Sequence, residues 1–289
     1  MDISKYKLDK KSNFKLSGIK TNDSGKFEEK DKAKELLIEN IERMMELQSK
    51  LYAQGKYALL IIFQAMDTAG KDGTIKHVMS GLNPQATQVH SFKQPSAEEL
   101  NHDYLWRTTK NLPERGSIGI FNRSYYEEVL VARVHNLVKS QQIPKKYINN
   151  DIWKTRFRQI NDFEKYLYEN GIIPIKFFLH ISREEQAKRL LERIDNTSKN
   201  WKFSAADLTE RQYWNEYQAA YQDAICETST SYAPWYIIPS DKKWFSHLLV
   251  SEIIARKVES LKLQYPSISD EQKAMLKKCK QKLLTEKYY

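Results

Sequence analysis

The chain has 289 residues, of which 40% are hydrophobic and 12% aromatic, so it can bury a sizeable core and does not resemble a disordered protein. Its net charge of +10 favours a polyanionic partner, although a solvated basic surface has the same composition. Two cysteines, Cys226 and Cys279, exclude a disulfide framework, and no Cys/His cluster indicates zinc. The sequence contains no signal-peptide core and no 18-residue apolar run, so we expect a soluble, cytoplasmic protein without membrane contact.

Apolar runs and helical periodicities alternate along the chain. Residues 1–28 are polar and lysine-rich, and we expect an extended arm. An amphipathic helix over 31–51, a buried strand over 57–66 and a helix from residue 74 follow. The same patterns then predict strands over 87–92, 116–122, 172–181 and 235–240, and helices over 98–112, 125–138, 151–170, 210–226 and 244–262.

Five strands that alternate with helices predict an α/β fold, a doubly wound parallel five-stranded sheet with helices on both faces. No internal repeat or interdomain linker interrupts this pattern. We therefore predict a single domain over 29–265, with a charged segment over about 182–212 and a lysine-rich tail over 266–289.

A short loop with the sequence QAMDTAGKDGT (64–74) follows the first apolar strand. It resembles the phosphate-binding loop GxxxxGK[ST], but Ala65 replaces the first glycine and Asp72 replaces the hydroxyl that holds magnesium. Such a loop lies at the carboxyl end of its strand, where backbone N–H groups and a helix N-terminus bind phosphate. An ordinary turn is the alternative. Our prediction is a phosphate site formed by the loop residues Thr68, Ala69, Gly70, Lys71, Asp72 and Gly73.

Within this loop, Lys71 offers a mobile point charge for a bridging or transferred phosphoryl group. Asp67 is the nearest oxygen donor of the kind that magnesium prefers, and we predict that it is a metal ligand. Asp72 is less suited to this role because it begins the helix and complements its dipole.

A second polar group follows the third predicted strand, in the sequence FNRSYYEE (121–128). Phosphate-loop enzymes usually place a magnesium-holding carboxylate at this kind of strand end, whereas Asn122 is neutral. Arg123 can direct its planar guanidinium at phosphate oxygens. Glu127 and Glu128 can restore the missing negative charge, although an ordinary ion pair between Arg123 and Glu127, four residues apart, is the alternative.

Four segments together resemble the polyphosphate kinase 2 family: QAMDTAGKDGTI, FNRSYYEEVLVARVH, LERIDNTSKNWKFS and ETSTSYAPWYIIP, in this order over about residues 30–262. The resemblance implies a P-loop kinase-like fold with a helical lid. It also implies magnesium-assisted transfer of a phosphoryl group between inorganic polyphosphate and adenine or guanine nucleotides, with manganese as an alternative metal. Asp67 and Lys71 match family residues, whereas many members have Asp-Arg where this chain has Asn122-Arg123. In this feature the sequence resembles the class III subgroup, which accepts AMP as well as ADP. The asparagine also leaves the choice of metal ligands open among Asp67, Glu127 and Glu128.

A long polyphosphate requires a basic track, and the candidates outside the loop are Lys76, Arg107, Arg123 and Arg133. In the expected lid, over about 182–212, Arg189 and Arg193 share a helix face, and Arg193 matches a lid arginine of the family. The alternative is that these charges only form a solvated helix surface, on which Arg189 pairs with Glu185. A lid of this kind excludes water from the reacting phosphates.

The sequence therefore favours a polyphosphate:nucleotide phosphotransferase that needs no general base, because the terminal oxygen of a nucleotide phosphate is already ionised. The sequence leaves two alternative functions open: an ATP-dependent nucleoside or nucleotide kinase of the same fold, and a non-catalytic polyanion-binding module. No nucleic-acid recognition signature is present, and we expect no nucleic-acid partner. Similarity to the family implies a homo-oligomer.

Overall fold

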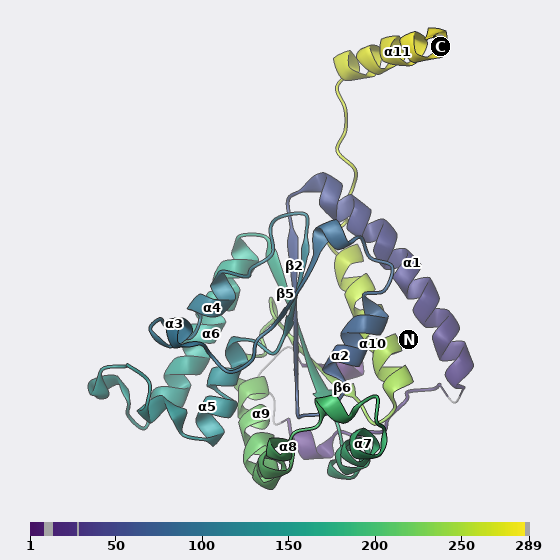
Figure 1. Cartoon of the computed structure of the whole chain (residues 1–289). Coiled ribbons are helices and arrows are strands. Elements are labelled where there is room, and N and C mark those ends of the chain that lie inside the picture. The colour runs from purple at the N-terminus through teal and green to yellow at the C-terminus, as the bar shows by residue number, and fades with distance from the viewer. Residues whose placement is uncertain (9–13, 28, 287–289) are drawn as a thin grey trace.

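The computed structural model describes residues 1–8, 14–27 and 29–286, and its centre is a six-stranded sheet (Figure 1). The strand order is β1-β6-β5-β2-β4-β3. Every pairing is parallel except that of β1 with β6. The strands are β1 (Lys7–Leu8), β2 (Ala58–Ala65), β3 (Thr87–Ser91), β4 (Ile118–Asn122), β5 (Ile172–His180) and β6 (Trp235–Pro239).

The predicted parallel strands are confirmed, but the predicted number of five is wrong. The sixth strand, β1, comes from the arm that we expected to be extended over 1–28. Apolar side chains explain this attachment, because Tyr6 and Leu16 of the arm are buried in the core. Two short 3-10 helices, η1 (Ser4–Tyr6) and η2 (Leu16–Gly18), carry these residues, and positions 9–13 and 28 of the arm lie outside the described residues.

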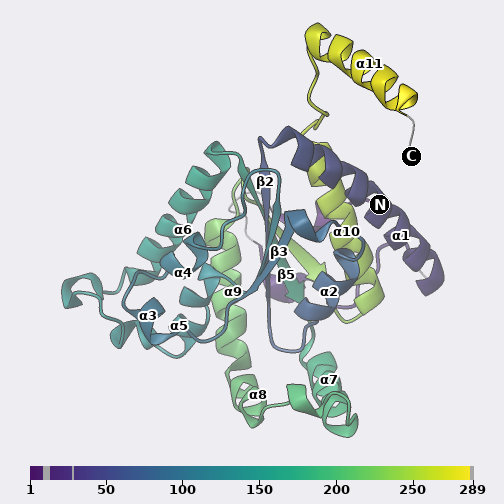
Figure 2. The ribbon, with the colours of Figure 1, turned by 45° about the horizontal axis from the view of Figure 1, so that its top comes forward.

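Helices cover both faces of the sheet (Figures 1 and 2). One face carries α1 (Lys30–Gln54), α2 (Lys71–Val78) and α10 (Lys243–Glu259), and the other carries α6 (Ile152–Glu169) and α9 (Trp214–Thr228). The helices α7 (Arg183–Asp195) and α8 (Ala205–Glu210) lie beyond the carboxyl ends of the strands, together with the 3-10 helices η7 (Asn200–Lys202) and η8 (Arg211–Tyr213).

The sheet is central because its strands are apolar on both faces, as parallel strands between two helical layers must be. All eight residues of β2 are buried. Neighbouring elements approach closely at β4, where a Cβ added to Gly119 would lie only 2.9 Å from the Pro113 ring. Gly55 ends α1 in the left-handed conformation, with φ of 60°, and so turns the chain into β2.

Two predicted helices are shorter and broken in the structure. The segment 98–112 forms α3 (Ala97–Leu100) and α4 (Trp106–Thr109), because the Asp103 carboxylate accepts a hydrogen bond from the Leu105 N–H and so competes with the helix between them. The segment 125–138 forms η4 (Tyr125–Glu128), α5 (Val131–Val134) and η5 (Leu137–Lys139). Asn136, with φ of 54°, interrupts helical geometry in this segment.

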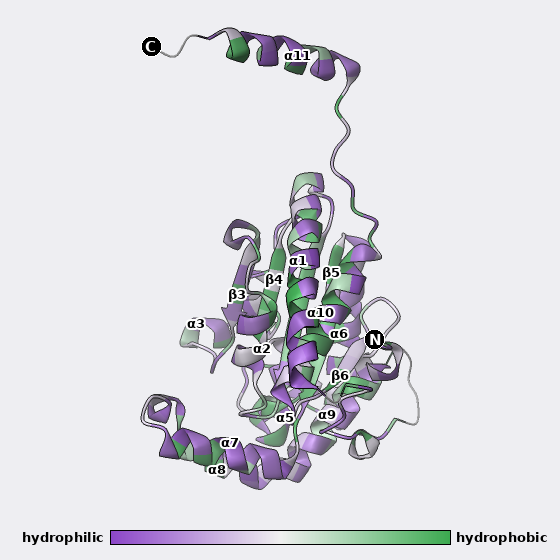
Figure 3. Ribbon diagram, turned by 90° about the vertical axis from the view of Figure 1, so that its right-hand side faces the viewer, coloured by the Kyte–Doolittle hydropathy of each residue, from purple (hydrophilic) through white to green (hydrophobic). Residues whose placement is uncertain are grey.

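The remaining elements are η3 (Pro84–Ala86), η6 (Lys145–Tyr147) and α11 (Asp270–Thr285). The last of these lies in the lysine-rich tail and projects away from the rest of the chain in Figures 1, 2 and 3. Among the described residues, no helix combines the length and the apolar character needed to cross a membrane.

Candidate functional site

The loop between β2 and α2 has the backbone geometry of an anion cradle. Thr68 and Gly70 both have positive φ, 62° and 108°, and Lys71 begins the helix immediately afterwards. Consecutive turns of this kind direct N–H groups toward one point, and the first N–H groups of a helix lack partners within that helix. A positive φ at a residue other than glycine is strained, and such strain concentrates at functional sites.

Lys71 is half-buried and lies against the loop itself. Its Nζ donates to the carbonyl of Ala65 at 3.0 Å, while the Met66 carbonyl lies at 3.5 Å. Burial and, to a smaller extent, the Arg123 guanidinium lower the pKa of this amine to about 8, although Asp67, Glu127 and Asp72 oppose the shift. Among the described residues its recorded hydrogen-bond partners are backbone carbonyls and not carboxylates, and a phosphate oxygen would supply an anionic partner.

Arg123 brings two carboxylates together at the end of β4. Its own φ is positive, 65°, and its backbone N–H donates to the carbonyl of Phe63 in β2 at 3.0 Å. One guanidinium nitrogen lies 3.0 Å from Asp67 Oδ1 and the other 3.9 Å from Glu127 Oε2. The i,i+4 alternative from the sequence thus describes only the longer of the two contacts.

Glu127 faces this cluster from η4. Burial raises its pKa, and Arg123 and Lys71 oppose that shift. When the Gln64 amide is oriented with its nitrogen toward this carboxylate, it donates to Glu127 Oε1 at 3.0 Å. The structure therefore places Asp67, Lys71, Arg123 and Glu127 around one point at the carboxyl ends of β2 and β4.

Asn122 lies beside the cluster and holds the first turn of α2. Its amide nitrogen donates to Asp72 Oδ1 at 2.7 Å and lies 3.4 Å from the Ser91 hydroxyl. The neutral amide is a donor here, which an aspartate at this position could not be without taking up a proton.

Of the two predicted lid arginines, Arg189 is bound to the loop and is only 4% exposed. It donates to the carbonyls of Thr68, Ala69, Ser240 and Asp241 at 2.6–3.2 Å and also pairs with Glu185. These partners occupy its donors in the structure, which favours a supporting role for Arg189 over the predicted contact with polyphosphate. It supports the loop from outside instead, together with Gln186, which donates to the Asp67 carbonyl at 3.0 Å.

Arg193, one turn further along α7, points toward the start of α8. Its Nη1 lies 3.5 Å from Asp207 Oδ2 and is partly exposed. Asp207 has a raised pKa because it is partly buried and also because of the Asp67 charge nearby. The sequence analysis did not identify Asp207, although Ser204, three residues earlier, is a typical N-cap that places it in a helical first turn.

Three of the other predicted residues form their ion pairs with residues outside the cluster. The Glu128 carboxylate faces away from the cluster, since it is buried against Arg156 at 2.9 Å and Gln141 at 2.7 Å, and this favours Glu127 over Glu128 as the predicted metal ligand. Arg133 pairs with Asp223 at 2.6 Å. Arg107 lies beside Glu99 at 3.3 Å, and Lys76 is exposed on α2.

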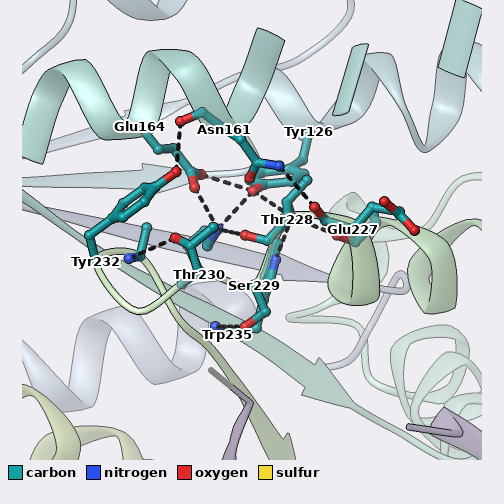
Figure 4. A network of polar contacts seen from close by, with 12 residues as sticks. Tyr126, Asn161, Glu164, Glu227, Thr228, Ser229, Thr230, Tyr232 and Trp235 are labelled. Atoms are coloured by element: carbon teal, nitrogen blue, oxygen red, sulfur yellow. Dashed lines mark hydrogen bonds and ion pairs between the residues drawn. The ribbon is translucent and has the colours of Figure 1, made fainter. Parts of the chain in front are cut away.

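A polar network, which includes the buried residues Tyr126, Glu164 and Thr228 in Figure 4, anchors η4 to the core. Lys176 of β5 donates to Glu164 at 2.6 Å, to the Thr228 carbonyl at 2.7 Å and to the Tyr126 hydroxyl at 3.0 Å. Tyr126 donates in turn to Glu164 at 2.8 Å. Because Tyr126 immediately precedes Glu127, this network fixes the segment from which Glu127 faces the cluster.

The donors present fit a magnesium ion. No group of three His, Cys, Asp or Glu suited to a metal occurs within residues 1–8, 14–27 and 29–286. Magnesium, however, is commonly held by one or two carboxylates together with waters and substrate phosphates. Asp67 and Glu127, both of which face Arg123, are the two carboxylates of the cluster that would suit such a site.

A mainly parallel sheet, a loop with the geometry of an anion cradle at the end of β2 and mixed charges at the end of β4 are typical of the P-loop kinase-like class of proteins. The family model described as Polyphosphate kinase 2 (PPK2) matches residues 26–266. This chain therefore belongs to the polyphosphate kinase 2 family.

Two curated relatives and one solved structure show how close the similarity is. An ADP-polyphosphate phosphotransferase of Rhodopseudomonas palustris is 52% identical over 89% of this chain and 90% of its own. An AMP/ADP-polyphosphate phosphotransferase of Meiothermus ruber is 46% identical over 91% of this chain and 96% of its own. The crystal structure of a Polyphosphate Kinase 2 from Arthrobacter aurescens superposes with a TM-score of 0.85 at 38% identity, covering 94% of this chain and 95% of the other.

Proposed function

We propose that this protein transfers the terminal phosphoryl group of inorganic polyphosphate to AMP and ADP, and catalyses the reverse reaction. Family membership supports the reaction type, and the relative from Meiothermus ruber carries both acceptors in its name. The observation that carries the proposal is the meeting of Lys71, Asp67, Arg123 and Glu127 at one edge of the sheet. Asn122 supports the class III assignment, in which both AMP and ADP are acceptors.

Alignment and charge neutralisation are sufficient for this chemistry. The attacking oxygen of a nucleotide phosphate carries a negative charge near neutral pH, so no side chain has to remove a proton. Lys71 and the N–H groups of 68–73 hold the phosphoryl group, and Arg123 neutralises charge on the adjoining phosphate. The strained backbone at Thr68 and Arg123 fixes these donors before substrate binds.

Asp67 and Glu127 are the residues that would hold magnesium, or manganese as an alternative. The bound ion would neutralise phosphate charge and help to align the two substrates. In the protein alone, Arg123 occupies the space between the two carboxylates. We therefore expect Arg123 to exchange Asp67 for phosphate oxygens when the metal and substrate bind.

The lid divides into a fixed and a movable part. Arg189 and Gln186 hold the first two turns of α7 against the loop, whereas Arg193 and Asp207 have a single long contact. We assign Arg193, together with Lys76 and Arg133, to the polyphosphate track, and we assign the segment after α7 to closure over the phosphates. We further propose that the enzyme is cytoplasmic and forms a homo-oligomer.

The test is donor and acceptor choice. The purified protein is incubated with magnesium, long-chain polyphosphate and AMP, ADP, GMP or GDP, and the nucleotides are separated by chromatography. We expect ADP and ATP from AMP. If the folded protein forms no higher nucleotide, the proposal is wrong. Phosphorylation of a nucleoside by ATP, unaffected by polyphosphate, would favour a nucleoside kinase, and salt-sensitive polyanion binding without transfer would favour a binding module.

A further inference from the structure

Helix α11 is amphipathic and unpartnered in the described structure. It projects from the domain at the end of an extended segment in all three ribbon views (Figures 1, 2 and 3), and none of its described residues is buried. Met275, Leu276 and Leu283 are each more than half exposed. Together with Cys279 they follow a helical spacing of three, four and seven residues, so they form one apolar stripe.

One edge of this stripe is basic. Lys273 and Lys280 lie on the same side of it, since each is three or four residues from a stripe residue, and Lys277 lies further around that side. A capping box at Ser269 and Gln272 starts the helix, so its beginning is defined by the sequence. A helix of 16 residues is nevertheless marginally stable alone in water, and its apolar stripe predicts a docking partner.

The outer face of α1 has the complementary pattern. Ile38, Met45 and Tyr52 recur every seven residues and are 57%, 44% and 57% exposed. Along one side of this stripe lie four exposed acids: Glu35, Glu39, Glu42 and Glu46. Among the described residues, only Glu46 of these four has a recorded ion pair, with Lys50. In Figure 3 the helix α1 runs down the middle of the view, with its outer face toward the viewer.

We propose that α11 of one copy docks on the α1 stripe of a second copy, with its lysine edge against the acidic edge of α1. The linker supports exchange between copies. Leu263 is the last buried residue before α11. Tyr265 lies near Lys50, close to the end of α1, where it adds slightly to the effect of Glu46 in raising the pKa of that lysine. The segment from Gln264 to Ser269 is extended and contains Pro266, which restricts the residue before it to extended conformations and so favours α11 pointing outward.

Exchange of α11 between two copies would also cover the apolar stripes of α11 and α1 in both copies at once. Each copy presents one α11 and one α1 stripe, so two copies related by a two-fold axis can bury both pairs in a closed assembly. The inference concerns assembly and does not depend on the proposed reaction, because α11 and the outer face of α1 contain none of the residues of the phosphate site.

Disulfide trapping tests the contact in the full chain. Cys279 lies on the α11 stripe, so Cys226→Ser is combined in turn with Ile38→Cys, Met45→Cys or Tyr52→Cys. The matched control is Tyr166→Cys on α6, another exposed aromatic position, at 62%. We expect at least one α1 position to give a cross-link between copies about tenfold faster than the control, because docking raises the effective concentration of the two thiols. A bond within one chain, or cross-linking no faster than the control at all three positions, would overturn the proposal.

The molar mass of charge-changing variants supplies a second measurement. Leu276→Glu/Leu283→Glu and Lys273→Glu/Lys280→Glu should each lower the molar mass in light scattering after gel filtration, while Ala274→Glu, on the side of α11 opposite the stripe and the lysine edge, should not. Adding Glu35→Lys/Glu42→Lys to the lysine reversal should restore the mass. A mass unchanged by both α11 pairs contradicts the inference. Circular dichroism checks that each variant remains folded.

Discussion

Lys71 and Lys176 lie in the same sheet-and-loop framework, yet their environments are opposite. Lys176 is fully buried, and its amine has three hydrogen-bond acceptors within 3.0 Å, one of them the carboxylate of Glu164. Lys71 is half-buried, and its amine lies against backbone carbonyls, with carboxylates nearby but not bonded to it. A charge with satisfied partners stabilises the fold, whereas a charge with unfilled bonding capacity is available to a ligand.

The largest expected effect tests the structural half of this comparison. Lys176→Met should lower the free energy of unfolding by about 3–5 kcal/mol, because it leaves the buried Glu164 carboxylate without its partner. Turnover of the remaining folded protein should fall much less than in Lys71→Ala, since Lys176 acts only through the segment that carries Glu127. Urea unfolding measures the loss, and Lys165→Met, on the exposed side of α6, is the control. An unchanged unfolding midpoint would show that the network contributes little.

The next effect concerns the functional half. Lys71→Ala should lower kcat by about 10²- to 10³-fold or more without lowering the unfolding midpoint, because a preorganised phosphate donor is lost. Asp67→Ala should act similarly and weaken the dependence on magnesium. Steady-state kinetics beside thermal unfolding separate the two properties, with Lys139→Ala as a matched surface control. Near-normal turnover in either variant removes that residue from the mechanism.

The two arginines of α7 extend the comparison to the lid. Arg189→Ala should lower the free energy of unfolding by about 1–3 kcal/mol, because buried loop carbonyls lose their donor. Arg193→Ala should leave stability within about 0.5 kcal/mol of the parent protein, since surface changes rarely exceed that. We expect Arg193→Ala to raise the KM for polyphosphate instead. The reverse assignment of effects would show that α7 binds substrate through Arg189.

A smaller effect follows from the pKa of Lys71, lowered to about 8 by burial and by Arg123. Below this pH the amine is already charged in the free enzyme, so the contribution of Lys71 to the affinity for polyphosphate should not change with pH. Above it the free amine loses its proton, which the bound phosphate restores, so affinity should fall by up to about tenfold per pH unit. Calorimetry in buffers of different ionisation enthalpy should detect proton uptake on binding. Lys71→Ala should abolish that uptake, and its persistence would identify another group.

The smallest effect is expected for Asn122→Asp. The new carboxylate would face Asp72, whose present partner is the Asn122 amide at 2.7 Å. Repulsion should displace the first turn of α2 and shift the preference between AMP and ADP, a change worth about 1 kcal/mol. The ratio of kcat/KM for the two acceptors measures it. An unchanged ratio, with an unchanged dependence on magnesium, would show that Asn122 has no selective role.

Much of the sheet could be predicted because strong local signals agree. The apolar runs 57–66 and 172–181 match β2 and β5 closely, and alternation with helices indicates their parallel order. The strand β1 could not be predicted, since two residues in a polar arm carry no period of their own. It forms through long-range contacts, such as those that bury Tyr6.

The meeting of the candidate site's side chains at one edge of the sheet was predictable where the residues follow strands. Asp67, Lys71 and Arg123 lie at strand ends, which a parallel sheet brings to one edge. Neighbouring positions gave no such information, so Glu127 and Glu128 could not be distinguished, although one faces Arg123 and the other Arg156. Asp207 was missed because only tertiary packing brings α8 near Asp67.

The hydrogen bonds of Arg189 to four backbone carbonyls divide the lid in a way that matters for engineering. Since this side chain joins α7 to both the phosphate loop and the end of β6, a swinging movement cannot start before it. We expect the pivot of the proposed lid to lie beyond Arg189, between the end of α7 and the start of α8, in residues 196–204. Exchanging that short stretch between homologous enzymes should therefore alter how quickly products leave, while the anion-binding floor keeps its shape.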